Sequence, residues 1–115
     1  MLQKREIKPW GWYEIIKKCK NYQIKLLHVE PGAALSLQSH KYRSEHWIVL
    51  SGEATVVRNN EEFKLILNES IYIQVGDKHR LSNNTDKAIE IIEVQTGTSF
   101  EEGDIIRYDD IYNRL

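Results

Sequence analysis

The chain has 115 residues and a mass of 13.6 kDa, which is enough for one domain with its own core. Sixteen basic and seventeen acidic residues give a net charge of −1, so no overall field favours nucleic acid or a membrane surface as a partner. The single cysteine, Cys19, excludes an intramolecular disulfide, and the sequence shows no long apolar run. We therefore expect a soluble, cytoplasmic protein.

Short runs rich in branched and aromatic residues recur along the chain and predict strands. Residues 1–8 are expected to form an N-terminal tail, and residues 9–115 a single domain. The expected strands are 13–17, 22–30, 35–40, 45–50, 54–58, 62–66, 70–75, 79–83 and 88–94. The first two flank the polar turn KKCKN and are expected to form a hairpin, and Asn59-Asn60, Gly76-Asp77 and Asn83-Asn84 are expected turns.

Many short strands at close spacing, with few helical patterns, predict an all-β sandwich or jelly-roll barrel. The unbroken apolar run at 45–50 is typical of a strand covered on both faces. The last segment, EEGDIIRYDDIYNRL, fits either a short helix or an irregular segment packed on the barrel. We expect both chain ends to be short non-β segments.

A polar set of side chains interrupts the strand pattern near the middle of the chain. Gln38 and His40 are two residues apart and so share one face of a strand, and Glu45 begins the next strand. His79, at the start of a later strand, would complete a set of nitrogen and oxygen donors of the kind that a divalent metal needs. We therefore predict a metal site formed by Gln38, His40, Glu45 and His79.

The spacing of these residues resembles the two motifs of the cupin superfamily. The first motif, Gly-x5-His-x-His-x4-Glu-x6-Gly, is matched by Gly32, Gln38, His40, Glu45 and Gly52. The second motif, Gly-x5-Pro-x-Gly-x2-His-x3-Asn, is matched by Asn68, Gln74, Gly76, His79 and Asn83. Glutamine replaces the first histidine, and asparagine and glutamine replace the glycine and proline of the second motif.

Longer segments narrow the resemblance to one family within the cupin superfamily. The segments KPWGWYE, LSLQSHKYRSEHWIVLSGEATV, ESIYIQVGDKHRLSN, IEIIEVQTG and GDIIRYDD look like the type II phosphomannose isomerase domain, which is the C-terminal part of bifunctional mannose-1-phosphate guanylyltransferases. The resemblance runs from about Pro9 to Arg114. It implies a cupin barrel and one divalent metal ion, with zinc expected first and iron, cobalt, nickel or manganese as alternatives. Because no guanylyltransferase half is seen, we do not expect nucleotide transfer from this chain alone.

The implied reaction interconverts mannose 6-phosphate and fructose 6-phosphate through an enediolate, in the supply of nucleotide sugars or surface polysaccharides. A phosphate on the substrate requires a cation, and the resemblance points to Arg80 beside His79, although strict alternation turns Arg80 away from the cavity unless a bulge intervenes. Lys25 and Arg43 are further candidates. The general base is not named by the sequence, and Glu93 or Lys25 could serve.

Other residues and functions stay open at this point. His46 is expected to face away from Glu45, His28 to be structural, and the tryptophans to belong to the core, whereas Tyr72 and Gln95 are weaker pocket candidates. Rival functions are a non-catalytic sugar-phosphate-binding domain that partners a separate nucleotidyltransferase, a metal-dependent oxygenase, and another sugar-phosphate isomerase or epimerase. A phosphorylated hexose is the expected ligand, and a homodimer is the expected assembly.

Overall fold

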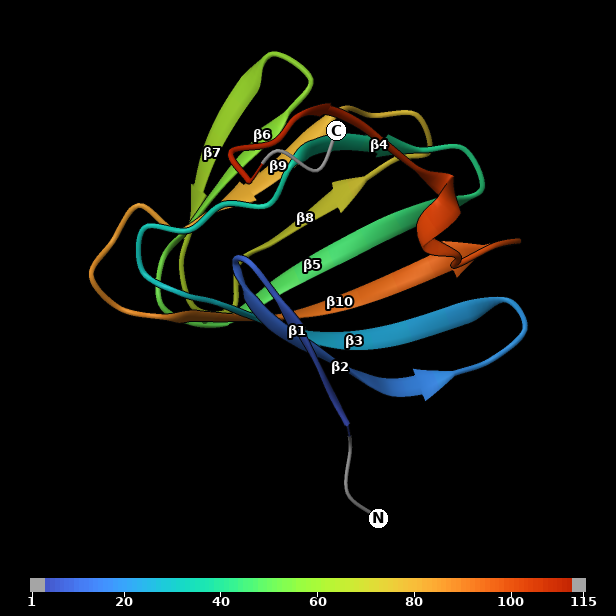
Figure 1. Cartoon of the computed structure of the whole chain (residues 1–115), viewed down its shortest axis with the longest axis horizontal. Helices are drawn as coiled ribbons and strands as arrows, with labels where there is room; N and C mark the ends of the chain where they lie inside the picture. The colour runs from blue at the N-terminus through green and yellow to red at the C-terminus, as the bar shows by residue number, and fades with distance from the viewer. Residues whose placement is uncertain (1–3, 113–115) are drawn as a thin grey trace.

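The computed structural model describes residues 4–112, and these form two antiparallel sheets that face each other (Figure 1). The larger sheet contains, in spatial order, β1 (Arg5–Lys8), β2 (Gly11–Lys18), β3 (Tyr22–Val29), β10 (Ile89–Gly97), β5 (Arg43–Ser51) and β8 (Ser70–Ile73). The smaller sheet contains β11 (Ile105–Asp109), β4 (Leu37–His40), β9 (His79–Ser82), β6 (Ala54–Arg58) and β7 (Glu61–Leu65). The prediction of an all-β jelly-roll barrel is confirmed.

The two ends of the chain differ from the expected non-β segments. Arg5–Lys8 is strand β1, which pairs with β2 and is fixed by a 2.9 Å ion pair between Arg5 and Glu14. Near the other end, a 3-10 turn, η1 (Glu102–Asp104), leads into β11, which pairs with β4. Both corrections have one physical cause, because each segment completes the hydrogen bonds of an otherwise open sheet edge.

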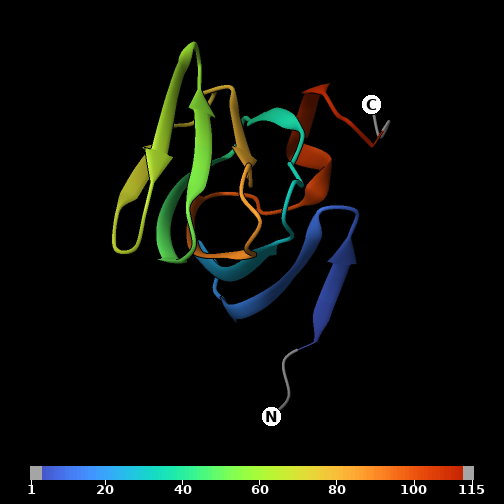
Figure 2. The ribbon, with the colours of Figure 1, turned by 90° about the vertical axis from the view of Figure 1, so that its left-hand side faces the viewer.

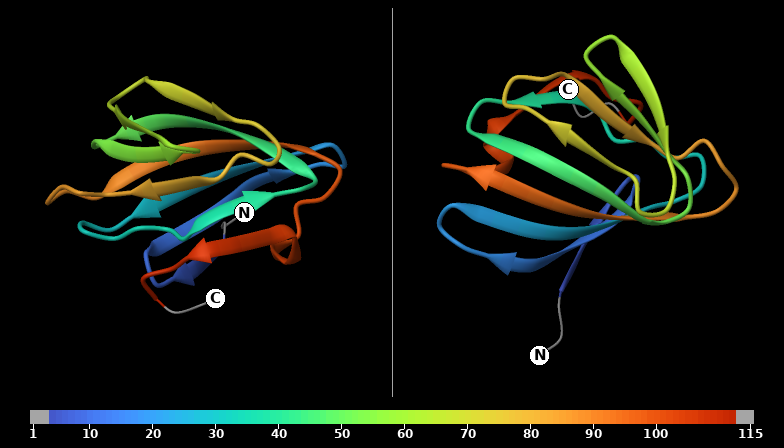
Figure 3. Two further views of the ribbon diagram at one scale, coloured as in Figure 1. Left: turned by 90° about the horizontal axis from the view of Figure 1, so that it is seen from above. Right: turned by 180° about the vertical axis from the view of Figure 1, so that it is seen from behind.

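The apolar core fills the space between the two sheets, which curve around it (Figures 2 and 3). Along β5 the buried side chains alternate with more exposed ones, so that Glu45, Trp47 and Val49 point inward while His46 is exposed. The strand is therefore not covered on both faces as its apolar run predicts. The predicted hairpin is present as β2 and β3.

The outer face of the larger sheet carries half-buried apolar side chains, among them Leu26, Ile48 and Ile92. A homodimer through such a face stays a prediction. Within residues 4–112, no helix is long and apolar enough to cross a membrane.

Candidate metal centre

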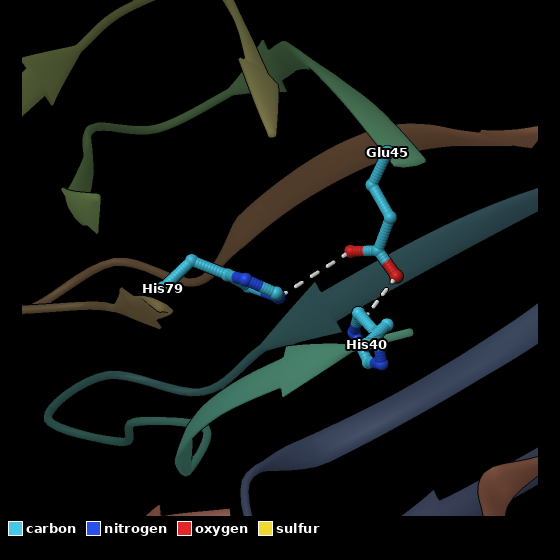
Figure 4. Close-up of side chains that lie close together, drawn as sticks. All are labelled: His40, Glu45 and His79. Carbon is cyan, nitrogen blue, oxygen red and sulfur yellow. Dashed lines mark ion pairs between the residues drawn. The ribbon is translucent and has the colours of Figure 1, made fainter. Parts of the chain in front are cut away.

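Three strands bring His40, Glu45 and His79 together between the sheets (Figure 4). His40 ends β4, Glu45 lies in β5 and His79 begins β9, and all three are buried. The Nε2 atom of His40 lies 3.2 Å from Oε2 of Glu45, and Nε2 of His79 lies 3.7 Å from Oε1 of Glu45. Two donors that share one ion at about 2.1 Å each lie roughly 3–3.5 Å apart, so this spacing fits a first-row metal ion.

The two imidazole rings also fit a metal. Nδ1 of His79 lies 2.9 Å from the Asp77 carbonyl oxygen, and a hydrogen bond there leaves Nε2 as the unprotonated nitrogen that faces Glu45. Both ring nitrogens of His40 are buried and lack a hydrogen-bonding partner among residues 4–112, since the approach of Nε2 to Glu45 is close but poorly aligned. A buried nitrogen without a partner is costly, and a bound cation would satisfy it.

Gln38 lies directly across β4 and β9 from His79, so the two side chains share the inner face of the sheet. Its Nε2 donates to the hydroxyl oxygen of Ser36 at 2.9 Å. That hydrogen bond leaves Oε1 as the Gln38 atom available to a metal ion. Gln38 also lines the same pocket as Glu45 and His79.

Neighbouring groups fix the Glu45 carboxylate in place. The indole Nε1 of Trp47 donates to Oε1 at 3.2 Å, and Nε of Arg43 donates to Oε2 at 3.1 Å. Burial by itself would raise the pKa of Glu45, but the close approach of His40 and the charges of His79, His40 and Arg43 hold it well below its usual range. Burial lowers the pKa of His79. The site therefore favours a carboxylate and a neutral imidazole, the protonation states in which both residues bind metals.

The loop that joins the two metal-site strands is tied down by the turn η1. The buried Asp104 carboxylate accepts hydrogen bonds from the backbone N–H groups of Lys41, at 2.9 Å, and Tyr42, at 3.0 Å. Gly97 lets β10 approach the same loop, because a Cβ atom at its φ of +153° would lie 2.1 Å from the Tyr42 carbonyl oxygen. These contacts set the spacing between His40 and Glu45.

A pocket opens from the metal-site residues toward the edge of the barrel where β1, β2 and β11 lie. Its lining residues combine acidic, basic, amide and aromatic groups: Lys8, Trp10, Tyr13, Lys25, Leu27, Leu35, Ser36, Gln38, Arg43, Glu45, Trp47, His79, Leu81, Glu93, Gln95, Glu102, Ile105 and Arg107. The predicted residues Lys25, Arg43, Glu93 and Gln95 are therefore brought together with Gln38, Glu45 and His79. Pockets in which a few polar groups converge among apolar and aromatic side chains are typical sites for small ligands.

Glu93 lies beside the metal site and is linked to it through Gln95. The Gln95 amide donates to Oε2 of Glu45 at 3.4 Å and, in a short hydrogen bond, to Oε1 of Glu93. Burial and then the negative charge of Glu45 raise the pKa of Glu93 to about 8, against the opposing charge of Lys25. A carboxyl group with a pKa in this range can both donate and accept a proton near neutral pH.

The structure does not bring Arg80 to this pocket. The strand β9 pairs with β6 in regular register, so Arg80 faces away from the cavity while His79 faces into it. Its guanidinium donates to the Asp109 carboxylate at 3.0 Å. Tyr72 is likewise on the outer face, where its ring lies near His46.

His28 also lies outside the pocket, stacked on Trp12 at 4.8 Å between ring centroids. Its two ring nitrogens lie close to the carboxylates of Glu30 and Glu90. The tryptophan prediction holds for Trp10 and Trp47, which belong to the core and also line the pocket.

Sequence reasoning did not single out four polar residues that line the pocket. Lys8 and Tyr13 come from the first two strands, and Glu102 and Arg107 come from η1 and β11. The expected tail and the unassigned C-terminal segment thus contribute directly to the pocket. The only signal that pointed toward Lys8, Tyr13 and Arg107 was the resemblance of KPWGWYE and GDIIRYDD to a known domain, and Glu102 lies just before the second segment.

Comparison with known proteins shows relatives that share nearly the whole chain. The chain is 48% identical over 107 residues to the xanthan biosynthesis protein XanB of Xanthomonas campestris pv. campestris (strain B100), which covers 93% of this chain and 23% of XanB. It is 44% identical over 112 residues to the mannose-1-phosphate guanylyltransferase ManC of Salmonella typhimurium, which covers 96% of this chain and 23% of ManC. The chain thus spans about a quarter of the length of these relatives.

Solved structures share the fold at low sequence identity. The capsular polysaccharide assembling protein CapF from Staphylococcus aureus superposes with a TM-score of 0.80 at 18% identity over 95% of this chain and 33% of CapF. A Cupin 2 conserved barrel domain protein from Salinispora arenicola superposes with a TM-score of 0.71 at 18% identity over 81% of each chain. These likenesses confirm the cupin barrel. The sequence pattern described as "Mannose-6-phosphate isomerase C-terminal" matches residues 2–110, and the chain belongs to this family.

Proposed function

We propose that this chain is a metal-dependent isomerase that interconverts mannose 6-phosphate and fructose 6-phosphate. The observation that carries the proposal is the buried group of His40, Glu45 and His79 beside a pocket with basic side chains, in a chain of the mannose-6-phosphate isomerase C-terminal family. The relatives XanB and ManC, named for xanthan biosynthesis and for mannose-1-phosphate guanylyltransfer, support a role in mannose-derived polysaccharide supply.

The residues that would hold the ion are His40, Glu45 and His79, with Gln38 through its carboxamide oxygen. A bound divalent ion would act as a Lewis acid toward the oxygens on C1 and C2 of the sugar. Zinc is proposed first, and iron, cobalt, nickel and manganese suit the same nitrogen and oxygen donors.

Aldose–ketose isomerisation moves one proton between C2 and C1, and a second proton between the two oxygens. We assign the carbon proton to Glu93, because its carboxyl is buried next to the metal site and its pKa of about 8 lies near neutral pH. In the aldose-to-ketose direction, the carboxylate form takes the proton from C2 and returns it to C1 of the enediolate. Gln95 holds Oε1 of Glu93, which orients the carboxyl group.

The test compares metal content and turnover in the same preparations. Purified protein, treated with a chelator and then supplied with single metal ions, is assayed for mannose 6-phosphate to fructose 6-phosphate conversion. His40→Ala is expected to abolish both the bound metal, measured by elemental analysis, and the turnover. His46→Ala is the matched control, because His46 is exposed on the other face of β5, and it should retain both.

Turnover by the metal-free protein would overturn the proposed role of the metal. Tight binding of mannose 6-phosphate without turnover under any metal would support the second candidate, a non-catalytic sugar-phosphate-binding domain.

A further inference from the structure

The pocket has a positively charged end that the metal site does not explain. Although the whole chain carries a net charge of −1, four basic side chains line the pocket, Lys8, Lys25, Arg43 and Arg107, against the carboxylates of Glu45, Glu93 and Glu102. The guanidinium of Arg43 is already held by Glu45 and by the Glu101 carbonyl oxygen. The other three basic groups of the pocket are Lys8, Lys25 and Arg107.

Arg107 is the least satisfied of the three. It points into the pocket from β11, and its Nε atom is buried without a hydrogen-bonding partner among residues 4–112. By contrast, Lys8 donates to Glu102 at 2.9 Å, and the ammonium group of Lys25 sits over the Tyr13 ring at 4.1 Å. A buried guanidinium nitrogen without an acceptor is costly, and an anion in the pocket would supply that acceptor. Nε of Arg80 is also buried without a partner, but only Arg107 combines this state with a place in the pocket lining.

The sheet places Arg107 at a defined distance from the metal site. Arg107 lies opposite Gln38 on the neighbouring strand, and Gln38 lies opposite His79 on the next one. Two strand spacings separate the backbones of Arg107 and His79 by about 10 Å. An elongated ligand can thus place oxygens at the metal site and an anionic group at Arg107, as a hexose 6-phosphate requires, since its reacting carbons and its phosphate are at opposite ends of the carbon chain.

We propose that Arg107, together with Lys25 from the same pocket, binds the phosphate group of the substrate and gives the pocket its preference for phosphorylated sugars. This inference rests on the proposed function, because it assigns the second end of the same ligand. The planar guanidinium offers two parallel N–H donors to phosphate oxygens, and the Lys25 ammonium adds a point charge. Arg80, on the outer face of β9, has no part in this site.

Calorimetric titration of the chelator-treated protein tests the assignment without turnover. The ligands are mannose 6-phosphate, inorganic phosphate and unphosphorylated mannose. Arg107→Gln is expected to weaken binding of both phosphate-containing ligands about tenfold to a hundredfold and to leave binding of mannose unchanged. Arg107→Lys keeps the positive charge but not the two parallel N–H donors of the guanidinium, so it should lose less phosphate affinity than Arg107→Gln. It also provides the test if Arg107→Gln does not fold.

Arg58→Gln is the matched control, because Arg58 donates to the Tyr72 carbonyl oxygen on an exposed part of the barrel and does not line the pocket. This variant should bind all three ligands as the wild type does. In turnover assays of the metal-loaded protein, Arg107→Gln should raise KM for mannose 6-phosphate more than it lowers kcat.

The outcomes separate the two proposals. Unchanged phosphate affinity in Arg107→Gln and Arg107→Lys, or a wild type that binds neither mannose 6-phosphate nor phosphate, overturns the assignment of Arg107. A different outcome is that the variants lose phosphate affinity while the wild type binds mannose 6-phosphate but never turns it over. That outcome supports the phosphate site and overturns only the isomerase proposal.

Discussion

Replacing Glu93 with glutamine should change how the stability of the metal-free protein depends on pH. Glu93 is buried, and burial together with the charge of Glu45 raises its pKa from 4.5 to about 8. The folded protein therefore keeps one more proton than the unfolded chain between these two values. Because stability falls with pH wherever the folded state binds more protons, the contribution is fully present below pH 4.5 and is lost as the pH rises toward 8.

The size of the effect follows from the width of that window. Each pH unit between the two pKa values costs about 1.4 kcal/mol of unfolding free energy, so the wild type should lose about 4 kcal/mol from this group between pH 5 and pH 8. Glu93→Gln has no proton to release, and its amide oxygen can still accept the hydrogen bond from Gln95. The free energy of unfolding of the variant minus that of the wild type should therefore rise by about 4 kcal/mol over the same range.

Urea denaturation of both proteins at half-unit pH steps, with chelator present, measures this difference. Titrating groups far from Glu93 are common to both proteins and cancel in the subtraction. Glu45 interacts with Glu93, but its pKa is held well below its usual range, so it stays ionised throughout this pH window. Glu62→Gln provides the matched control, because Glu62 is exposed on β7 and the substitution removes the same charge without a buried site. If the unfolding free energy of Glu93→Gln minus that of the wild type changes by less than about 1 kcal/mol from pH 5 to pH 8, the reasoning is refuted. The basis for Glu93 as the proton carrier is then removed as well.

Two further variants test whether η1 restrains the loop between β4 and β5 and whether Arg80 contacts the ligand. Asp104→Asn should lower the free energy of unfolding by about 1–3 kcal/mol in urea denaturation at pH 7, because one carboxylate oxygen that accepts from Lys41 or Tyr42 becomes an amide donor; an unchanged value would mean that η1 does not restrain this loop. Arg80→Gln should lower the free energy of unfolding by at most about 1 kcal/mol, because its partner Asp109 is largely exposed. This variant should also leave the affinity for mannose 6-phosphate unchanged. A tenfold weaker affinity in that variant would place Arg80 at the ligand after all.

The sequence was sufficient to predict the barrel and the meeting of His40, Glu45 and His79. Strand periodicity places side chains two apart on the same face, and the apolar runs mark where strands lie. Sequence alone could not predict what surrounds these residues. The hydrogen bond from Gln95 to Glu45 joins β10 to β5, and only the folded sheet sets the register that places these two residues opposite each other.

The two arginines show the same limit. In β9, His79 points inward and no bulge intervenes, so alternation sends Arg80 outward, as the period of a regular strand requires. A resemblance at the level of a short segment cannot overrule that geometry. The structure instead supplies Arg107, from a strand that sequence patterns did not predict.

The pattern of β11 explains why it was missed and why it matters. A strand that packs on a core normally turns apolar residues inward and polar residues outward. In β11 Ile105 faces the pocket as this pattern predicts, but Arg107 faces it too, while Ile106 and Tyr108 are exposed. An arginine at an inward position weakens the sequence signal for a strand, and it has no benefit for packing, since a buried guanidinium nitrogen without a partner opposes folding. Departures of this kind are expected where function requires them. The inward-facing Arg107 thus supports a ligand anion on grounds that do not involve the metal-site residues.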